Sequence, residues 1–587
     1  MSLPSVENRA FSSTCRLVVL LEWSIVYDFQ GYHKAEFTGV GISPQRGVGS
    51  GIMAQRRRVL EIRITGGLSE APARFSWPRA ERSSLYDVET ALRRASDDRN
   101  IDGVLLELAD VRLGWSQAES LHRAMGDVRA RGKATIVFLA GADNVTYMLA
   151  SACETVVLAP AALLSLQSLS SDSLFFKDLL GAIGVSPEID AVGEFKSAGE
   201  ALERRESSEA HRLETKSILE DLNSQYVALV AGGREMPAAA VAAAIASGPF
   251  LPDEAKKLGL VDHVEHGDFC KSFLEEKLGA VPRYVAHGRY TAPPGLLRRA
   301  LRWRRPQVAV VHVCGVLTSG DSRNSPSGST TVGARSLTEI LSNLRERRRV
   351  RAVVLRIDSP GGGAVASDVI HRELSLLAKE KPVIVSMGDI AASGGYYIAA
   401  AAATVLAEGT SLTGSIGVIG GKLVVKRLFD RLGIARESVS LGANAGMFSP
   451  LRSFTEDERA RHRAHLEHFY RARFLPVVAE GRKMTLEKAD EVGRGRVWTG
   501  RQGRDVGLVD SLGGLHDAIE LAHEQANLES ARSRVVVYGR RARLRELLTF
   551  GLSENSLVAE LACRFSLIEE LAREDLLLLL PRIFRIR

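Results

Sequence analysis

Residues 383–399 read VIVSMGDIAASGGYYIA, and this stretch sets the expected fold of the chain. The apolar run Val383–Met387 is typical of a buried strand, and Gly388 and Asp389 are expected to end it. Small residues then lead to Ser393, and an alanine-rich run with helical character follows two glycines. A serine between a strand and a helix, with no bulk beside it, presents its hydroxyl to a substrate backbone. Ser393 is therefore either a nucleophile or a serine that caps a helix.

The composition is that of an ordinary globular protein. Of 587 residues, 45% are hydrophobic and 25% are charged, and the formal net charge is +7. Arginines are spread along the chain without a basic patch interleaved with aromatic residues, so nucleic acid is not an expected partner. The five cysteines are far apart and lack CxxC spacing, which argues against a disulfide framework or a zinc site. The best candidate for a membrane span, Leu17–Tyr27, is short and carries Glu22, whereas a spanning helix needs about 20 apolar residues.

The chain contains a long internal repeat. Val59–Ile64 resembles Val308–Val313, which lies 249 residues further on. The same offset relates Asp102–Leu108 to Arg351–Ile357, and a constant offset over so much of the chain indicates a tandem duplication. We predict an N-terminal extension that is either disordered or an over-extended start, a first repeat, a basic linker, a second repeat and a partly helical, apolar and basic tail. Their predicted limits are 1–52, 53–283, 284–307, 308–530 and 531–587, respectively.

Each repeat alternates short β-branched runs with longer helical patterns. In the second repeat, Val353–Ile357 precedes an expected helix over 366–379, and the strand of the opening stretch follows. Strands that alternate with helices in this way pair in parallel, so the predicted fold class is α/β. The linker contains a basic amphipathic stretch at 296–303, and the tail is apolar and basic at 575–587. Each of these segments either packs against protein or lies on a membrane surface.

The two repeats differ at the position of Ser393. Counting back 249 residues from Ser393 reaches Asn144, which has no nucleophilic hydroxyl. The first repeat instead carries Lys196, whose partner in the second repeat at the same offset is Ala445. One repeat thus has the serine and the other has the lysine. We therefore predict a single site that forms across the interface between the repeats.

A serine paired with a lysine is typical of nucleophilic acyl transfer. Lysine acts as a base only where its pKa is lowered, and burial between two domains supplies that shift. Ser415 is the candidate that orients Lys196, and the amides of Gly362 and Gly394 are candidates for an oxyanion hole. Each residue also has a simpler interpretation, because most lysines are solvated and serine and glycine are common in turns.

His371 offers an alternative base for a Ser-His-Asp triad. It follows the glycine turn, but no partner spacing supports the triad, and we expect His371 on the solvated side of a helix. No group of His, Cys, Asp and Glu has metal-ligand spacing, so the sequence predicts no metal site.

At these residues the sequence resembles the signal peptide peptidase A family, also called protease IV, in its long, duplicated form. The resemblance rests on five motifs: Asp389–Tyr397, Ser359–Gly362, Thr413–Gly417, Phe195–Ala198 and Gly507–Asp510. It implies that Ser393 is the nucleophile of a serine endopeptidase and that Lys196 is the general base. It also implies a Clp-protease/crotonase-like domain built from ββα units, present twice, and no cofactor.

The resemblance further implies the substrates and the setting of the protein. The expected substrates are hydrophobic peptides such as signal-peptide remnants. The expected assembly is a membrane-attached homo-oligomer, a tetramer, on the periplasmic side of an inner membrane. Two other functions stay open from the residues alone: a crotonase-type enzyme acting on an acyl thioester, and a catalytically silent membrane scaffold.

Overall fold

The structure is a computed structural model, and it describes most of the chain between residues 57 and 539 and two short strands beyond. The described residues are 57–72, 84–291, 304–324 and 330–539, together with the backbone of the strands Leu577–Leu579 and Arg585–Ile586. The predicted N-terminal extension, 1–52, and the amphipathic stretch 296–303 lie outside the described residues. Within the described part, Cys153 and Cys270 are buried free thiols and Cys314 is a partly exposed one.

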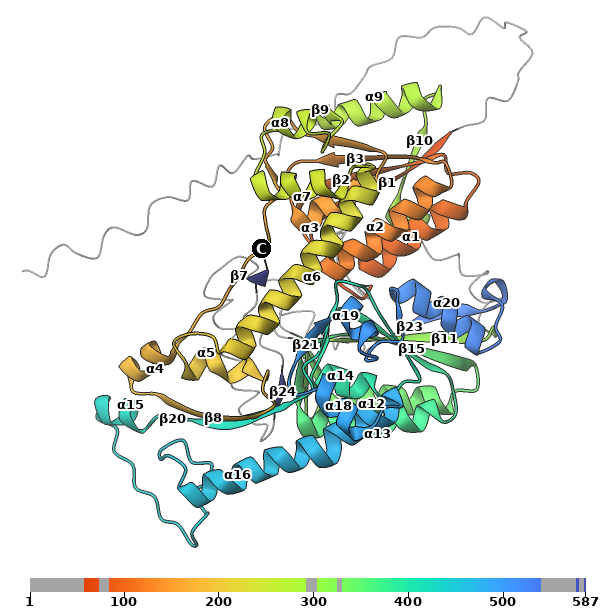
Figure 1. Ribbon diagram of the computed structural model, residues 1–587. Coiled ribbons are helices and arrows are strands. Elements are labelled where there is room, and N and C mark those ends of the chain that lie inside the picture. The colour runs from red at the N-terminus through yellow and green to blue at the C-terminus, as the bar shows by residue number, and fades with distance from the viewer. Residues whose placement is uncertain are drawn as a thin grey trace, which may run out of the picture. The chain divides into compact units, whose positions relative to one another are not determined.

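The first repeat is built on a six-stranded parallel sheet with the order β10-β1-β2-β3-β5-β9 (Figure 1). Its strands are β1 (Arg58–Gly67), β2 (Gly103–Arg112), β3 (Ala134–Leu139), β5 (Thr155–Leu158), β9 (His263–Val264) and β10 (Arg283–Ala286). All four residues of β5 are buried, as expected for a parallel strand that is covered on both faces.

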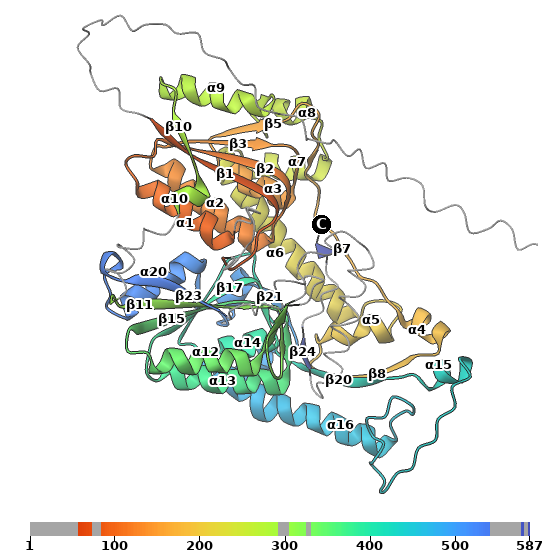
Figure 2. The ribbon, with the colours of Figure 1, turned by 180° about the vertical axis from the view of Figure 1, so that it is seen from behind.

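Helices cover both faces of this first sheet. On one face, α1 (Leu85–Asp97) and α2 (Trp115–Ala130) pack around a core that includes Leu106. On the other face lies α9 (Gly267–Leu278) (Figure 2), whose Cys270 and Leu274 belong to one core with Leu105. Adjacent strand residues point to opposite faces, which is why Leu105 and Leu106 belong to different cores. The other elements of this repeat are β4 (Ala142–Asp143), α3 (Asn144–Ser151), β6 (Leu164–Ser165), β7 (Ser171–Asp172), α4 (Lys177–Ile183), β8 (Ser186–Val192), η1 (Ser197–Gly199), α5 (Glu200–Glu203), α6 (Glu209–Arg234), α7 (Ala238–Ser247), α8 (Pro252–Lys257) and α10 (His287–Tyr290).

The second repeat has a sheet of the same kind, with the path β21-β19-β17-β15-β11-β23. The strands β11, β15, β17, β18 and β23 pair in parallel, and β21 joins β19 in the antiparallel sense. The strands of this sheet are β11 (Gln307–Cys314), β15 (Val350–Ser359), β17 (Val383–Ala392), β18 (Thr404–Ala407), β19 (Leu412–Gly414), β21 (Val497–Thr499), β22 (Ser511–Leu512) and β23 (Arg534–Tyr538).

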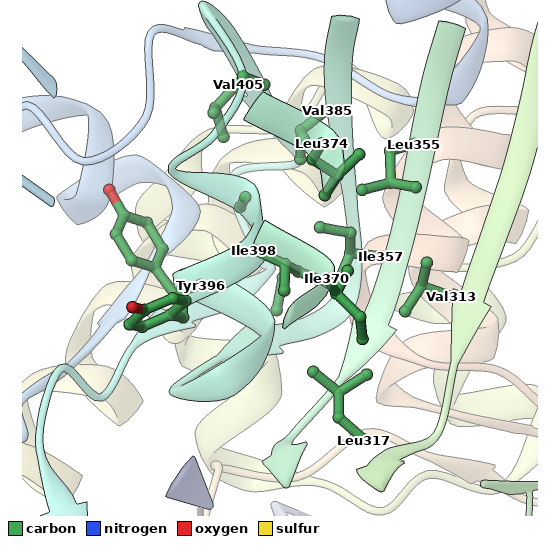
Figure 3. Packing of buried hydrophobic residues seen from close by; sticks show 14 of the residues in the cluster. Val313, Leu317, Leu355, Ile357, Ile370, Leu374, Val385, Tyr396, Ile398 and Val405 are labelled. Atoms are coloured by element: carbon green, nitrogen blue, oxygen red, sulfur yellow. The ribbon is translucent and has the colours of Figure 1, made fainter. Parts of the chain in front are cut away.

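The second sheet is also covered on both faces. Figure 3 shows Leu355 of β15 among the apolar side chains of α13 (Ala364–Ala378) and α14 (Gly394–Ala399). The neighbouring residue Val354 points to the opposite face, where α20 (Leu515–Gln525) packs. The other helices here are α12 (Ala334–Glu346), α15 (Lys426–Arg431), α16 (Glu456–Phe469), the π-helix η2 (Tyr470–Phe474), α17 (Leu475–Arg482), α18 (Leu486–Val492), α19 (Gly500–Asp505) and the 3-10 helix η3 (Ser530–Arg532).

Both repeats keep the same internal hydrogen bonds. Tyr147 donates its hydroxyl to the carbonyl oxygen of Leu260 at 2.6 Å, and Tyr396 donates to that of Leu508 at 2.8 Å. In each repeat, the aspartate of the shared Gly-Leu-Val-Asp motif accepts a bond of 2.7 Å from a strand amide. These matched bonds confirm the predicted tandem duplication of an α/β domain.

The sheet of each repeat includes a strand that extends past the predicted C-terminal limit of that repeat. The predicted linker, 284–307, begins inside β10, which pairs with β1 as an edge strand of the first sheet. In the same way, β23 lies in the predicted tail and pairs with β11 of the second sheet. In the rest of the predicted tail, the described elements are two short strands, β24 (Leu577–Leu579) and β25 (Arg585–Ile586).

A third sheet joins the two repeats. Its order is β13-β14-β12-β16-β24-β20-β8, and its first-repeat member is β8. The strand β8 pairs antiparallel with β20 from Ser186 opposite Val424 to Val192 opposite Val418. The other strands of this sheet are β12 (Val316–Thr318), β13 (Arg323–Asn324), β14 (Thr330–Gly333), β16 (Gly361–Gly363) and β20 (Val418–Val424). The segment that follows β8 therefore lies next to the second repeat.

Candidate active site

Ser393 lies at the junction of β17 and α14. Its backbone has φ 55° and ψ −113°, a region that residues other than glycine rarely occupy. Its amide donates to the carbonyl oxygen of Gly414 at 2.7 Å, which fixes the turn. The prediction that Gly388 and Asp389 end the strand is wrong. β17 continues to Ala392 because its first half pairs with β18 and its last residues pair with β19.

The interpretation of Ser393 as a helix cap receives no support from its side chain. Ser393 occupies the N-cap position of α14, but its hydroxyl makes no capping hydrogen bond to the helix. The hydroxyl instead lies beside the amine of Lys196.

The glycines next to Ser393 leave no room for a side chain. A Cβ atom at Gly394 would lie 2.6 Å from Oγ of Ser367 and 3.1 Å from the amide nitrogen of Gly362. A Cβ atom at Gly395 would lie 2.8 Å from a backbone oxygen. The glycine turn that contains Gly362 therefore packs directly against the start of α14. The two amides predicted for an oxyanion hole belong to neighbouring segments.

Lys196 reaches this place through a turn that follows β8. Gly193 has φ 116°, so the chain bends in a way that favours glycine. The amide of Phe195 then donates to the carbonyl oxygen of Arg494 at 2.8 Å. A Cβ atom at Gly495 would lie 2.5 Å from the backbone nitrogen of Lys196, so the two chain segments are in direct contact.

The structure brings Lys196, Ser393 and Ser415 together. Nζ of Lys196 lies 2.8 Å from Oγ of Ser393 and 2.9 Å from both Oγ and the carbonyl oxygen of Ser415. Lys196 is 5% exposed, and Ser393 is fully buried. The serine from one repeat and the lysine from the other are thus within hydrogen-bonding distance.

The turn at Ser415 directs both the carbonyl oxygen and the hydroxyl oxygen of this residue toward the amine of Lys196. Gly414 and Ser415 have φ values of 82° and 52°, and a Cβ atom at Gly414 would lie 2.8 Å from the carbonyl oxygen of Arg496. The amide of Ser415 donates to that same carbonyl oxygen at 2.7 Å. β21 follows Arg496 and so supports the turn.

The electrostatics of the site favour an uncharged lysine. Burial lowers the pKa of Lys196 to about 7, and the carboxyl of Glu214 opposes that shift. Burial also raises the pKa of Glu214. Near pH 7, a large fraction of Lys196 is therefore in the neutral form that accepts a proton.

Glu214 is a residue that the sequence analysis missed. Its Oε1 accepts a bond of 2.6 Å from the amide of Val497, so it joins α6 of the first repeat to β21 of the second. Glu214 lies on the buried face of α6 with Ile218 and Leu222. Its i, i+4 spacing from Ile218 was the available signal, because an acidic residue in an apolar stripe needs a special partner.

Asp389, four residues before Ser393, ties the serine-bearing strand to the first repeat. Its Oδ1 accepts bonds from the amide and the hydroxyl of Ser116 at 2.9 and 2.8 Å. Gly114 is the N-cap of α2, and a Cβ atom there would clash with the Asp389 carboxylate. A side chain of the second repeat thus satisfies an amide at the start of a first-repeat helix.

A buried ion pair crosses the same interface. Nε of Arg356 donates to Oε2 of Glu70 at 2.8 Å, and the side chains of the two residues are 1% and 4% exposed. Arg356 also donates to the carbonyl oxygen of Met387 at 2.6 Å. The signal for this pair was an arginine inside an otherwise apolar run of β15, which marks a charge that must be paired when buried.

The expectation that His371 lies on a solvated helix face is wrong. His371 is partly buried on α13, and its ring packs edge-on against Tyr397 with 5.3 Å between the ring centroids. Burial lowers the pKa of His371, so the imidazole is held in its neutral form.

The corresponding position of the first repeat serves a structural purpose. Asn144 is 5% exposed and exchanges two hydrogen bonds with the backbone of Gln167. Its Nδ2 donates to the carbonyl oxygen of Gln167 at 2.8 Å, and the Gln167 amide donates to its Oδ1 at 3.0 Å. The side chain at this position of the first repeat is thus engaged in holding a loop.

A family comparison agrees with this geometry. The model of peptidase family S49 matches residues 128–280 and 375–529, one match in each repeat and together more than half of the chain. The chain belongs to peptidase family S49. The resemblance to the protease IV family is thereby confirmed, and this member of S49 is a serine peptidase.

The similar S49 proteins include relatives that match over most of this chain. "Serine protease SPPA, chloroplastic" from Arabidopsis thaliana is 31% identical over 475 residues, with 80% of this chain and 69% of that protein covered. "Protease 4" from Salmonella typhi is 30% identical over 524 residues, with 84% and 82% covered. Among solved structures, a ClpP1 mutant from Listeria monocytogenes is 15% identical, with 38% of this chain and 99% of that chain covered and a TM-score of 0.24.

In the part of the chain that the structure describes, no single helix combines the length and hydropathy needed to cross a membrane. The pair α6 and α7 meets the criteria only together, with a bend of 115° between them.

Proposed function

We propose that this S49 peptidase is an endopeptidase with a Ser-Lys dyad formed by Ser393 and Lys196. The observation that carries the proposal is the 2.8 Å distance between Nζ of Lys196 and Oγ of Ser393 in a buried site. Ser415 also bonds to the amine and serves to orient it. A serine hydroxyl needs a base to attack a carbonyl, and a neutral amine at this distance is such a base.

In the proposed reaction, Oγ of Ser393 bonds to the carbonyl carbon of the scissile peptide while its proton moves to Nζ of Lys196. The amides of Gly362 and Gly394 donate to the oxyanion of the tetrahedral intermediate, and each such donor contributes about 2.7–4 kcal/mol. The protonated Lys196 then gives the proton to the leaving amine as the C–N bond breaks. Water then attacks the acyl carbon while Lys196 accepts its proton, and Lys196 returns that proton to Oγ of Ser393 as the acyl carbon–Oγ bond breaks and the acid product leaves.

The proposed substrates are hydrophobic peptides such as signal-peptide remnants. The names of the relatives support a protease of this group, and the resemblance to protease IV supplies the substrate class. Assembly into a homo-oligomer, a tetramer by resemblance, and attachment to a membrane belong to the same proposal. Size-exclusion chromatography with light scattering tests the oligomer, and sedimentation with lipid vesicles tests the attachment.

A comparison of matched variants tests the catalytic assignment. Ser393→Ala and Lys196→Ala are expected to remove cleavage of a fluorogenic leucine-rich peptide while the circular dichroism spectrum stays unchanged. Ser375→Ala and Lys381→Ala are the controls, because both residues are partly buried and bond to helix or loop carbonyls away from this site. Retained cleavage in either Ser393→Ala or Lys196→Ala contradicts the proposal.

A covalent probe distinguishes a peptidase from a silent scaffold. An active-site-directed acylating reagent is expected to label Ser393, as detected by mass spectrometry of the digested protein. Labelling should disappear in Ser393→Ala and persist in Ser375→Ala. An unlabelled Ser393 in a folded protein contradicts the nucleophile assignment.

A further inference from the structure

Two segments of the second repeat lead directly to the serines of the candidate site. Asp389 lies on β17 four residues before Ser393, and Thr410 lies five residues before Ser415. The ends of β17 and β19 pair with each other immediately before these two serines. A shift of either segment therefore changes the distances from the serines to the amine of Lys196.

The helix α2 of the first repeat contacts both of these segments. Near its start, the amide and the hydroxyl of Ser116 donate to Oδ1 of Asp389. One turn further on, Glu119 accepts a bond of 3.1 Å from the amide of Gly409. Glu119 also accepts bonds of 2.9 and 2.7 Å from the amide and the hydroxyl of Thr410. Residues three apart share a helix face, so one face of α2 holds both segments.

Further contacts from the first repeat fix the second of these segments. Arg123, one more turn along the same face of α2, forms two bonds of 2.7 Å with Glu408, whose side chain is fully buried. From α6, the side-chain amide of Gln225 donates to the carbonyl oxygen of Gly409 at 2.9 Å. Side chains of the first repeat thus bond to the amides of 409–410 and to the carbonyl oxygen between them. This stretch is therefore coupled to the position of the first repeat.

The equivalent carboxylate of the second repeat bonds within its own repeat. At the offset of 249 residues, Glu119 of α2 corresponds to Asp368 of α13. Asp368 accepts a bond of 2.6 Å from the hydroxyl of Tyr397 and one of 3.0 Å from Arg473. The shared scaffold therefore does not by itself explain why Glu119 reaches across to the other repeat.

We propose that Ser116 and Glu119 are positioning residues, which set Ser393 and Ser415 at bonding distance from the amine of Lys196. In this arrangement the first repeat supplies the base and also holds the two serine-bearing segments through α2. The inference rests on the proposed peptidase function and adds a means by which the docking of the repeats controls the rate. A displacement of about 1 Å at a reacting group can lower a rate by about 10²-fold, even when the altered contact is remote.

Kinetics of full-length variants test the positioning. Glu119→Ala should lower kcat for the fluorogenic leucine-rich peptide by about 10²-fold. KM should stay near the wild-type value, because the loss falls on the geometry of the reacting groups. Ser116→Ala keeps the amide bond to Asp389 and should show a smaller loss of kcat. An unchanged kcat in Glu119→Ala overturns the inference.

Two further variants separate positioning from a loss of stability. Glu119→Gln keeps one oxygen that accepts a bond from the amide of Thr410, so it should recover most of the lost kcat. Asp262→Ala is the matched control, because Asp262 accepts a bond of 2.7 Å from the amide of Val156 within the first repeat. It should lower the free energy of unfolding and leave kcat per folded molecule unchanged. Equal losses of kcat in Asp262→Ala and Glu119→Ala contradict a positioning role.

A titration of Lys196 gives an answer without cleavage. The rate at which acetic anhydride acetylates Lys196 follows its neutral fraction, and mass spectrometry of the digested protein measures that rate at a series of pH values. Looser packing in Glu119→Ala admits water, so the midpoint should move up toward the ordinary lysine pKa of 10.5. The midpoint of Asp262→Ala should stay at the wild-type value.

The titration also separates the two proposals. An unchanged midpoint in Glu119→Ala contradicts the positioning inference even if the wild type cleaves peptides. Conversely, no protein cleaves and Ser393 is not acylated if the peptidase proposal is wrong. A midpoint that still moves in Glu119→Ala and not in Asp262→Ala would then leave the positioning of the serine–lysine pair by α2 in place.

Discussion

The same strand-to-helix turn has opposite properties in the two repeats. In the first repeat, Asp143 precedes the helix with an ordinary φ of −92° and caps it through a bond from the amide of Thr146. In the second repeat, Ser393 precedes the helix with φ 55° and makes no capping bond. The first turn is relaxed and satisfied within itself, whereas the second is strained and places its hydroxyl beside Lys196.

The duplicated copies therefore share a scaffold and differ in their chemistry. The tyrosine bonds to Leu260 and Leu508 are present in both copies. The strained serine is present in one copy, and the buried lysine comes from the other. Backbone strain of this kind costs of order 1–3 kcal/mol and persists only where the surroundings impose it, so its presence at this turn of one copy marks that copy as the candidate site.

The largest effect is expected when the first repeat loses its lysine. Lys196→Met keeps the volume of the side chain but removes the base, so kcat/KM should fall by about 10²–10⁴-fold. Steady-state cleavage of a fluorogenic peptide measures this loss. Lys381→Met is the matched control and should retain wild-type activity. A Lys196→Met variant with wild-type kcat/KM would show that the first copy contributes no base.

The second prediction compares equivalent strand positions. Arg356 aligns with Glu107 at the repeat offset, but Arg356 pairs with Glu70 in a buried site and Glu107 pairs with Arg63 at the surface. Removing one member of a buried ion pair typically costs about 3–5 kcal/mol, so Arg356→Leu should lower the free energy of unfolding by that amount. Glu107→Gln should cost about 0–1 kcal/mol. Urea denaturation provides both values, and similar losses would contradict the assigned asymmetry.

The buried lysine of the first repeat should make cleavage depend on pH. In the proposed mechanism cleavage needs the neutral amine, so kcat/KM should fall about tenfold per pH unit as the pH drops below the Lys196 pKa of about 7. Glu214 raises that pKa, so Glu214→Gln should move the midpoint of the profile to lower pH while it keeps an acceptor for Val497. An unchanged midpoint in Glu214→Gln would mean that the two groups do not interact.

The same titration has a consequence for stability. The folded-state pKa of Lys196 lies below its ordinary value, so the unfolded chain binds more protons than the folded chain between pH 7 and the ordinary lysine pKa of 10.5. The contribution of Lys196 to the free energy of unfolding should therefore rise with pH across this window. Lys196→Met should lose that rise, and Lys216→Met, which replaces an exposed lysine of α6, is its control in urea denaturation at three pH values.

A smaller effect is expected at the turn of the first repeat. Asn144→Ala leaves the backbone groups of Gln167 without their Asn144 partners, which should cost about 1–3 kcal/mol of the free energy of unfolding. Its kcat per folded molecule should stay at the wild-type value. Ser393→Ala should show the reverse pattern, with activity lost and stability kept. A catalytic loss in Asn144→Ala would contradict a purely structural first turn.

The smallest effects test what the copies share. Tyr147→Phe and Tyr396→Phe each remove one buried hydrogen bond, and each should cost about 1 kcal/mol in thermal or urea unfolding. Because the two bonds are equivalent, the two losses should agree within experimental error. A marked inequality would show that the copies no longer share this part of the scaffold.

The sequence alone predicted the features that depend on the internal repeat or on a local pattern of apolar residues. The 249-residue offset revealed the duplication, and it also singled out Lys196 and Ser393, because each has no counterpart in the other copy. The helix expected at 366–379 is observed as Ala364–Ala378, because its apolar spacing has the period of a helix. The end of β17 was misjudged, since pairing with β19 outweighs the tendency of Gly388 to interrupt a strand.

The features that the sequence did not predict depend on contacts between distant segments. The pairing of β8 with β20 joins strands from different copies, and no local pattern specifies which strand will be the partner. Glu214 and Arg356 are ordinary charged residues until the interface buries them. Their interruption of apolar runs was visible in the sequence, but the identity of their partners was not.

The strand β8 has a consequence for stoichiometry. By crossing to the second copy, it brings the amine of one module to the hydroxyl of the other, so the proposed dyad uses two modules for one reactive serine. Titration with an acylating inhibitor should therefore reach one equivalent per polypeptide, half the number that the count of modules suggests.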